Sequence, residues 1–174
     1  MTTIADVDDL VELVERGAAV TDAEPVDLLA HALQTAAALA ERAPDDHELQ
    51  AAGLVHDIGW LLGAGADEHA SVGAAAVGPV LGPRVARLVQ QHVIAKRYLV
   101  AVDPDYMLSD RSRSTLMRQG GPLDEVEIDA FAADPEASAS LCLRRADDGA
   151  KEPGLVVAGI DRWRPVLEAL APTR

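Results

Sequence analysis

Residues 51–60, which read Ala-Ala-Gly-Leu-Val-His-Asp-Ile-Gly-Trp, constrain the fold of this chain more than any other stretch. Small apolar residues let a helix pack deeply against its neighbours, and this helix delivers His56 and Asp57 side by side into the interior. A buried imidazole beside a buried carboxylate is costly unless both groups have a partner, and a metal ion is a common one. Taken alone, the pair is equally compatible with a helix end that carries a core histidine and a capping aspartate.

The composition favours a helical protein. Aromatic residues make up only 3% of the 174 residues, and alanine and leucine dominate the apolar half of the chain. These residues form helices more readily than strands. The length suits one domain with a sizeable core, so we expect a single all-α domain over residues 1–174, with about eight to ten helices.

Net charge and cysteine content limit the partners and the compartment. The chain carries a formal charge of −14 at pH 7, so it should repel nucleic acid and anionic membranes. An anionic substrate would then need a local group of Lys and Arg side chains. A single Cys142 excludes an intramolecular disulfide and suits a reducing compartment. With no signal-peptide pattern and no apolar run of membrane-spanning length, a cytoplasmic protein is expected, of undetermined oligomeric state.

Apolar residues at helical spacing predict the order of the elements. The expected loop at residues 59–65 follows the helix that carries His56 and Asp57. The predicted helices cover residues 4–17, 25–44 with Pro25 in the first turn, 45–57, 69–79, 83–99, 109–118, 124–132, 136–151 and 161–170.

The histidines are distributed in an informative way. Four of the five lie in or beside apolar helical segments, and only His47 has charged neighbours. Either His31 or His92 alone would more often be a core residue than a ligand. Four inward-facing imidazoles with Asp57, however, suffice for two metal ions and a bridging carboxylate. Nitrogen and carboxylate ligands suit iron, manganese or zinc, and the lack of thiolate ligands argues against a structural zinc site.

Longer motifs carry a resemblance to a known family. The order of His31, His56-Asp57 and a late aspartate resembles the HD-domain superfamily, and the intervening His69 and His92 match its two-metal branch. Four further motifs are His92-Val93-Ile94-Ala95-Lys96-Arg97-Tyr98-Leu99, Ser112 with Thr115-Leu116, Gln119-Gly120-Gly121-Pro122 and Leu143-Arg144-Arg145-Ala146-Asp147-Asp148-Gly149-Ala150-Lys151. With these motifs the chain resembles the HD-domain mixed-valent diiron oxygenases that cleave organophosphonates, the relatives of 2-amino-1-hydroxyethylphosphonate dioxygenase.

The resemblance implies a single HD-domain helical bundle whose metal-binding core spans residues 25–151. It implies two Fe ions in a mixed-valent Fe(II)/Fe(III) pair, with O2 as co-substrate. Asp147 rather than Asp148 is the late ligand, because it stands four residues before Lys151 as in the family. Asp57 would bridge the irons and, with His69 and His92, form the catalytic part of the centre. The implied metal ligands are His31, His56, Asp57, His69, His92 and Asp147.

The resemblance also implies a binding site for the substrate. Lys96 and Arg144 match the residues that grip the phosphonate, and Arg can bind such a group bidentately. Two positions depart from the aminoethyl-binding members: Thr21 stands where they have Tyr, and Trp60 where they have a second His. Both fall at the organic end of the substrate, so the exact phosphonate stays open. The implied substrate-binding residues are Lys96, Arg144, Ser112, Gln119, Glu24 and Trp60.

The expected function is therefore oxidative cleavage of the C–P bond of a 1-hydroxyalkylphosphonate, with release of phosphate. The alternative is a metal-dependent phosphohydrolase of the HD superfamily, in which a metal-activated water attacks phosphorus. Lys96, Arg144 and the Gln-Gly-Gly-Pro motif favour the oxygenase, because ordinary HD hydrolases lack them. The complete ligand set argues against a non-catalytic binding protein.

Overall fold

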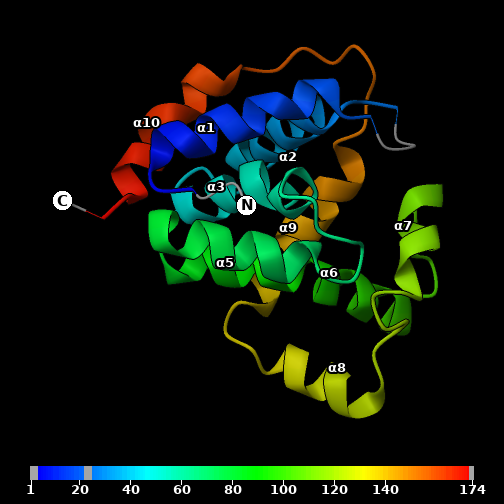
Figure 1. The fold of residues 1–174 in the computed structure, drawn as a ribbon. Helices are drawn as coiled ribbons and strands as arrows, with labels where there is room; N and C mark the ends of the chain where they lie inside the picture. The colour runs from blue at the N-terminus through cyan, green and yellow to red at the C-terminus, as the bar shows by residue number, and fades with distance from the viewer. Residues whose placement is uncertain (1–3, 22–24, 173–174) are drawn as a thin grey trace.

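The computed structural model describes residues 4–21 and 25–172, and Figure 1 shows their arrangement. In these ranges the chain forms ten α-helices and one 3-10 helix, with no β-strand. This confirms the predicted all-α class and number of helices. The elements are α1 (Val7–Glu15), η1 (Arg16–Ala19), α2 (Leu28–Arg42), α3 (His47–Val55), α4 (Ile58–Leu61), α5 (His69–Leu81), α6 (Pro83–Val102), α7 (Asp110–Leu116), α8 (Glu125–Ala132), α9 (Ala137–Gly149) and α10 (Ile160–Leu170).

Aspartate side chains define where several helices begin. The Asp27 carboxylate accepts a hydrogen bond from the Ala30 amide, and Asp46 accepts one from the Leu49 amide. Such N-caps satisfy backbone donors that have no partner inside the helix. The Asp27 cap places the start of α2 at Leu28, so the prediction of Pro25 in the first turn was wrong. An equivalent cap at Asp6 starts α1 later than the predicted residue 4.

Two further boundaries differ from the prediction. The helical turn α4 overlaps the first three residues of the loop expected at residues 59–65, and its first residue, Ile58, is buried in the core. The helix predicted to end at Pro79 continues through α5 to Leu81, because Val80 and Leu81 extend its buried face. Pro79 removes one helical hydrogen bond, but burial of these two side chains favours continuation of the helix.

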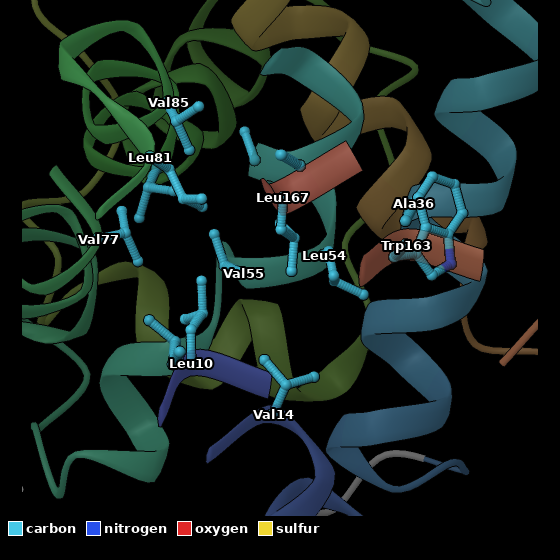
Figure 2. Packing of buried hydrophobic residues seen from close by; sticks show 14 of the residues in the cluster. Leu10, Val14, Ala36, Leu54, Val55, Val77, Leu81, Val85, Trp163 and Leu167 are labelled. Carbon is cyan, nitrogen blue, oxygen red and sulfur yellow. The ribbon is translucent and has the colours of Figure 1, made fainter. Parts of the chain in front are cut away.

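The main hydrophobic core lies where helices from both ends of the chain meet. Figure 2 shows side chains of α1, α3, α5 and α10 converging there, among them the fully buried Leu10, Leu54, Leu81 and Leu167. The terminal helices α1 and α10 also contact each other (Figure 1). Burial of an apolar side chain of this size contributes roughly 1.5–3 kcal/mol, so this shared core holds the bundle that carries the site.

A charged network fixes the ends of three helices. The Arg84 guanidinium at the start of α6 donates to Asp46 at 2.6 Å, to Glu48 at 3.2 Å and to Glu136 at 3.0 Å. These carboxylates lie at the starts of α3 and α9. The network therefore ties together three of the helices that present the residues of the site.

Helices α7 and α8 lie outside the main core, next to the C-terminal half of α6 (Figure 1). A smaller apolar cluster holds α8, in which the rings of Tyr98 and Phe131 lie 4.9 Å apart. None of the helices in the described ranges has the length and apolarity needed to cross a bilayer. The arrangement leaves α7 facing the bundle across the cavity described next.

Candidate active site

Five helical segments bring the six predicted metal ligands together. His31 lies on α2, His69 begins α5, His92 lies on α6 and Asp147 lies near the end of α9. The His56-Asp57 pair occupies the junction between α3 and α4. The ligand atoms fall into two groups, each with all its atoms within 4.8 Å of one another. One group is His31, His56 and Asp147, and the other is Asp57, His69 and His92.

Asp57 belongs to the second group but also faces the imidazoles of the first. Its Oδ2 is 3.9 Å from His31 Nε2 and 3.7 Å from His56 Nε2. Its Oδ1 is 3.6 Å from His69 Nε2 and 3.7 Å from His92 Nε2. One carboxylate therefore turns one oxygen toward each group, as a carboxylate shared between two metal ions would.

The hydrogen bonds of the four imidazoles fix which nitrogen faces the centre. The Nδ1 of His31, His56, His69 and His92 lies 2.8, 2.8, 2.9 and 2.6 Å from a backbone carbonyl oxygen. A carbonyl can only accept, so Nδ1 carries the proton of each neutral ring and Nε2 presents a lone pair.

The lone pairs of neighbouring rings point at one another. His31 Nε2 lies 3.2 Å from His56 Nε2, and His69 Nε2 lies 3.1 Å from His92 Nε2. Two acceptors at such distances repel unless a positive charge draws both of them. Carbonyl-bound Nδ1 atoms are the usual outer support of histidine ligands. The donor set therefore fits two metal ions.

Burial and neighbouring charges keep three of the ligands, Asp57, His69 and His92, in metal-binding protonation states. Burial lowers the pKa of His92, and with the nearby imidazoles brings it to about 3. Burial likewise lowers the pKa of His69. Burial raises the pKa of Asp57, but the four imidazoles outweigh it and hold that pKa well below its usual range. Neutral imidazoles and an ionised carboxylate are the forms that bind metals.

Asp147 also links the metal-ligand group to the predicted substrate residues. Its Oδ1 lies 3.2 Å from His31 Nε2, and its Oδ2 accepts a hydrogen bond of 2.6 Å from Arg144. Burial raises the pKa of Asp147, but the Arg144 charge outweighs burial and holds that pKa far below its usual range. Burial lowers the pKa of His31, but the bond with Asp147 and its charge outweigh burial and raise it.

A cavity of about 40 Å3 opens beside the two ligand groups. One water molecule needs roughly 10–15 Å3 of cavity volume, so the cavity accommodates only a small ligand. The charged residues that line the cavity are four cationic side chains and two carboxylates. The cavity therefore suits an anion, although the net charge of the whole chain is −14. The lining residues are Val26, Leu28, His31, Asp57, Trp60, His69, His92, Val93, Lys96, Arg111, Ser112, Thr115, Gln119, Arg144, Asp147 and Lys151.

Lys96 is buried in the wall of this cavity. It extends from α6 and donates to the hydroxyl of Thr115 at 3.2 Å and to the side-chain oxygen of Gln119. Burial, aided by the charge of Arg144, lowers the pKa of Lys96 to about 8. Gln119 in turn donates to the Ala66 carbonyl at 2.9 Å, the same oxygen that accepts from His69 Nδ1.

Arg144 is the second buried cation. It donates to Asp147, to the Ser112 hydroxyl at 3.3 Å and to the Tyr106 hydroxyl at 2.8 Å. Asp148 accepts from Arg144 through both carboxylate oxygens and from the Tyr106 hydroxyl at 2.6 Å. The guanidinium is thereby held in one orientation at the cavity wall.

Of the three residues predicted at the organic end of the substrate, Trp60 alone is shown to line the cavity. Trp60 lines the cavity, and its ring stacks on that of His69 with centroids 4.7 Å apart. The guanidinium carbon of Arg111 lies over the same indole at 4.7 Å. Thr21 is exposed and does not line the cavity. Glu24 lies outside the described residues.

Sequence reasoning assigned no role to several residues at this site, although Thr115 and Asp148 stand within the quoted motifs. Arg111 and Thr115 stand one residue before and three after Ser112, on a helix that the sequence did predict. Asp148 stands four residues after Arg144, a spacing at which opposite charges meet on a helix. Tyr106 lies in an irregular segment, and no sequence signal pointed to it.

Comparison with known proteins adds independent findings. No protein-family model matches the chain. The hydroxymethylphosphonate dioxygenase of Gimesia maris is 38% identical over 158 residues, which cover 84% of this chain and 78% of the relative. The chain belongs to the phosphonate dioxygenase family. It is thus an enzyme, a dioxygenase that acts on a small-molecule phosphonate, as the motifs implied.

Two further relatives extend the comparison. A (1-hydroxy-2-(trimethylamino)ethyl)phosphonate dioxygenase of Leisingera caerulea, described as glycine-betaine-forming, is 29% identical over 84% of this chain and 80% of its own length. An uncharacterised protein of Acanthamoeba polyphaga mimivirus is 30% identical over 94% of this chain and 81% of its own length. The named phosphonate dioxygenases and the two groups of His and Asp side chains together indicate that this protein binds metal.

Proposed function

We propose that this protein is an iron-dependent dioxygenase that cleaves the C–P bond of a 1-hydroxyalkylphosphonate and releases phosphate. The observation that carries the proposal is the position of Asp57 between two pairs of imidazoles, in a cavity that the buried cations Lys96 and Arg144 also line. The relative named as a hydroxymethylphosphonate dioxygenase and the small cavity favour a substrate with a small group on C1.

In this proposal the protein holds two irons through nitrogen and carboxylate ligands. His31, His56 and Asp147 would hold one iron, and His69 and His92 would hold the other. Asp57 would be shared between them, in agreement with the distances of 3.6–3.9 Å from its carboxylate oxygens to all four imidazole nitrogens. When bound, the iron pair supplies the one-electron chemistry that O2 needs in order to oxidise the carbon bearing the hydroxyl group.

The rest of the reaction depends on how the chain holds the substrate. Lys96 and Arg144 bind the phosphonate oxygens through charge-assisted hydrogen bonds, which contribute about 1.5–3 kcal/mol each. The Ser112 hydroxyl and Gln119 orient these cations and line the same wall. The side chains of Leu28, Trp60 and Val93 narrow the cavity and exclude water from the reacting carbon.

The overall reaction balances without an added reductant. Hydroxymethylphosphonate and O2 contain the atoms of formate and dihydrogen phosphate, and the carbon loses the four electrons that O2 gains. A longer 1-hydroxyalkylphosphonate gives the corresponding carboxylate. Phosphate release should therefore consume one O2 per turnover.

The test is to assay iron-loaded protein with hydroxymethylphosphonate and 1-hydroxyethylphosphonate, under air and under anaerobic conditions. We expect phosphate and O2 consumption in a one-to-one ratio under air, and no phosphate without O2. Asp147→Asn is a matched variant, because it keeps the shape of a ligand while removing its charge; it should lose iron and activity together. Phosphate release that continues without O2 would identify a phosphohydrolase and contradict the proposal.

A further inference from the structure

The four imidazoles of the site differ in where their outer hydrogen-bond partners come from. The Nδ1 atoms of His56, His69 and His92 each lie against the carbonyl oxygen three residues earlier in the chain. His31 Nδ1 instead lies 2.8 Å from the carbonyl oxygen of Ala150, 119 residues away. The orientation of the His31 ring therefore depends on a segment that tertiary structure has to bring to α2.

This segment has no regular secondary structure of its own. Helix α9 ends at Gly149, and residues 150–159 contain no helix or strand. The Ala150 amide still donates to the Asp147 carbonyl at 3.2 Å, but the Ala150 carbonyl belongs to the next peptide, beyond that bond. Holding an irregular backbone in one conformation costs entropy, so a contact further along the segment has to compensate for this cost.

Gln34 provides such a contact. It lies on α2 one turn after His31, and its side chain is buried. Its Nε2 donates to the Glu152 carbonyl at 2.8 Å, and its Oε1 accepts from the Glu152 amide at 3.1 Å. The carboxamide thus pairs with both backbone groups of a residue two positions beyond Ala150. We propose that Gln34 is a positioning residue that holds the Ala150 carbonyl against His31 and so strengthens metal binding by the ligand group that contains His31.

This inference rests on the two-metal part of the proposed function, but not on the reaction. Gln34 does not line the cavity, so it acts through the Ala150 carbonyl. With that carbonyl in place, His31 Nδ1 carries the proton and Nε2 presents its lone pair to the metal ion. Loss of such an outer partner typically lowers metal affinity by about 10- to 100-fold. The imidazoles of the other ligand group keep their local carbonyls, so its affinity should not change.

Lys151 also restrains the segment. Its Nζ lies 3.4 Å from the Ser109 hydroxyl and 4.0 Å from Asp147 Oδ1. These contacts hold the end of a long, flexible side chain, whereas Gln34 binds the backbone directly. Removal of the Gln34 carboxamide should therefore weaken the binding of one metal ion without abolishing it.

The experiment compares Gln34→Met with Gln50→Met. Methionine has nearly the length of glutamine but cannot form the hydrogen bonds of a carboxamide. Gln50 is the matched control, because it is also buried and donates to the backbone carbonyls of Ala43 at 2.8 Å and Pro44 at 3.0 Å, between α2 and α3. Gln34→Asn is a second variant, which keeps the carboxamide but withdraws it from Glu152 by one methylene group.

Three measurements are made on each full-length protein. Metal-free chains are equilibrated with Fe(II) at a series of free concentrations without O2, and the iron bound per chain is determined. Anomalous difference maps, from crystals at the concentration that just saturates the wild type, show which site holds the iron. Chemical denaturation of the metal-free proteins measures the stability that each substitution costs.

We expect the wild type to bind two irons. In both Gln34 variants the dissociation constant of one iron should rise at least tenfold, and the weakened peak should be the one beside His31. Gln50→Met should lose a similar amount of stability and still bind both irons as the wild type does. The inference is overturned if both irons weaken equally, if neither changes, or if Gln50→Met shows the same selective loss. It is overturned as well if neither Gln34 variant folds while Gln50→Met does, because Gln34 would then be a structural residue.

Failure of this inference can be told apart from failure of the proposed function. Fewer than two irons in the wild type would contradict the proposed metal pair and the role of Gln34 together. Two irons in the wild type, with an unchanged affinity in Gln34→Met, would leave the proposed function intact and overturn the role of Gln34 alone. No substrate is needed for either result.

Discussion

Lys96 is the cavity cation whose charge responds to pH near neutrality. Burial, with the charge of Arg144, lowers its pKa to about 8, so the side chain is charged below that pH and loses its charge above it. A phosphonate dianion binds the charged form. We predict that the inhibition constant of methylphosphonate rises as pH increases through about 8, by up to about tenfold per pH unit.

Lys96→Arg separates this effect from other pH-dependent steps. A guanidinium stays charged throughout the range, so the increase above pH 8 should flatten in this variant, even if its affinity at pH 7 is lower. Inhibition constants measured between pH 7 and pH 9.5 for both proteins give the comparison. An identical pH profile in the two proteins would mean that Lys96 does not titrate in the binding step.

Tyr106 acts on the substrate site through Arg144. Its hydroxyl accepts from Arg144 at 2.8 Å and donates to Asp148 at 2.6 Å. Tyr106→Phe removes both bonds and loosens the guanidinium without touching a metal ligand. We predict an increase in KM of about three- to tenfold, corresponding to the roughly 1 kcal/mol of one hydrogen bond, with kcat and iron content near wild type.

Tyr98→Phe is the control for this change, because its ring packs on Phe131 and lies outside the cavity lining. It should leave KM unchanged. Loss of iron in Tyr106→Phe, or an equal rise of KM in both variants, would show that the hydroxyl of Tyr106 does not position Arg144.

The sequence predicted the residues that meet at the site better than it predicted the residues that hydrogen-bond to them and hold them in place. Four histidines in apolar helical segments and one adjacent carboxylate were enough to suggest two metal ions, because such groups are rarely buried without a partner. These hydrogen bonds depend on tertiary contacts. The Ala150 carbonyl, for example, accepts from Nδ1 of His31, which is distant in the sequence. Tyr106 reaches Arg144 from an irregular segment, so no periodicity marked it.

At the scale of elements, the approach of α4 to α5 places His69. An added Cβ at Gly59 would lie 2.0 Å from the His69 carbonyl oxygen and 2.7 Å from its Cα. These are backbone atoms at the start of α5, so the two helices would have to separate. We predict that Gly59→Ala lowers the free energy of unfolding by about 1–3 kcal/mol and lowers the iron content toward one per chain.

Gly159→Ala is the matched control, since an added Cβ there meets nothing within 4 Å. Chemical denaturation and metal analysis of both variants provide the two measurements. Wild-type stability together with full iron content in Gly59→Ala would contradict the close packing of α4 on α5.

The ends of the helices show where sequence periodicity alone did not predict the structure. The spacing of apolar residues predicted the helices, but α2 begins later than predicted because Asp27 caps a backbone amide. The loop predicted at residues 59–65 begins only after the turn α4, whose Ile58 is buried in the core. Helix α5 continues past Pro79 because Val80 and Leu81 are also buried. In each case a tertiary or capping contact decided an end that periodicity left undetermined.

At the scale of the whole molecule, an acidic surface surrounds a cationic cavity. The chain has a net charge of −14, whereas the cavity is lined by four Lys and Arg side chains and two carboxylates. Helices from both ends of the chain share one core (Figure 2), and the ligand groups are drawn from α2, α5, α6, α9 and the α3–α4 junction. The two groups of candidate ligands are therefore assembled by the whole bundle rather than by one motif.

An anomalous difference map at the iron absorption edge, from crystals of iron-loaded protein, tests this account most directly. We predict two peaks on either side of the Asp57 carboxylate, one beside His31, His56 and Asp147 and the other beside His69 and His92. A single peak, or peaks at which Asp57 is not shared, would contradict the two-metal centre on which the proposed reaction depends.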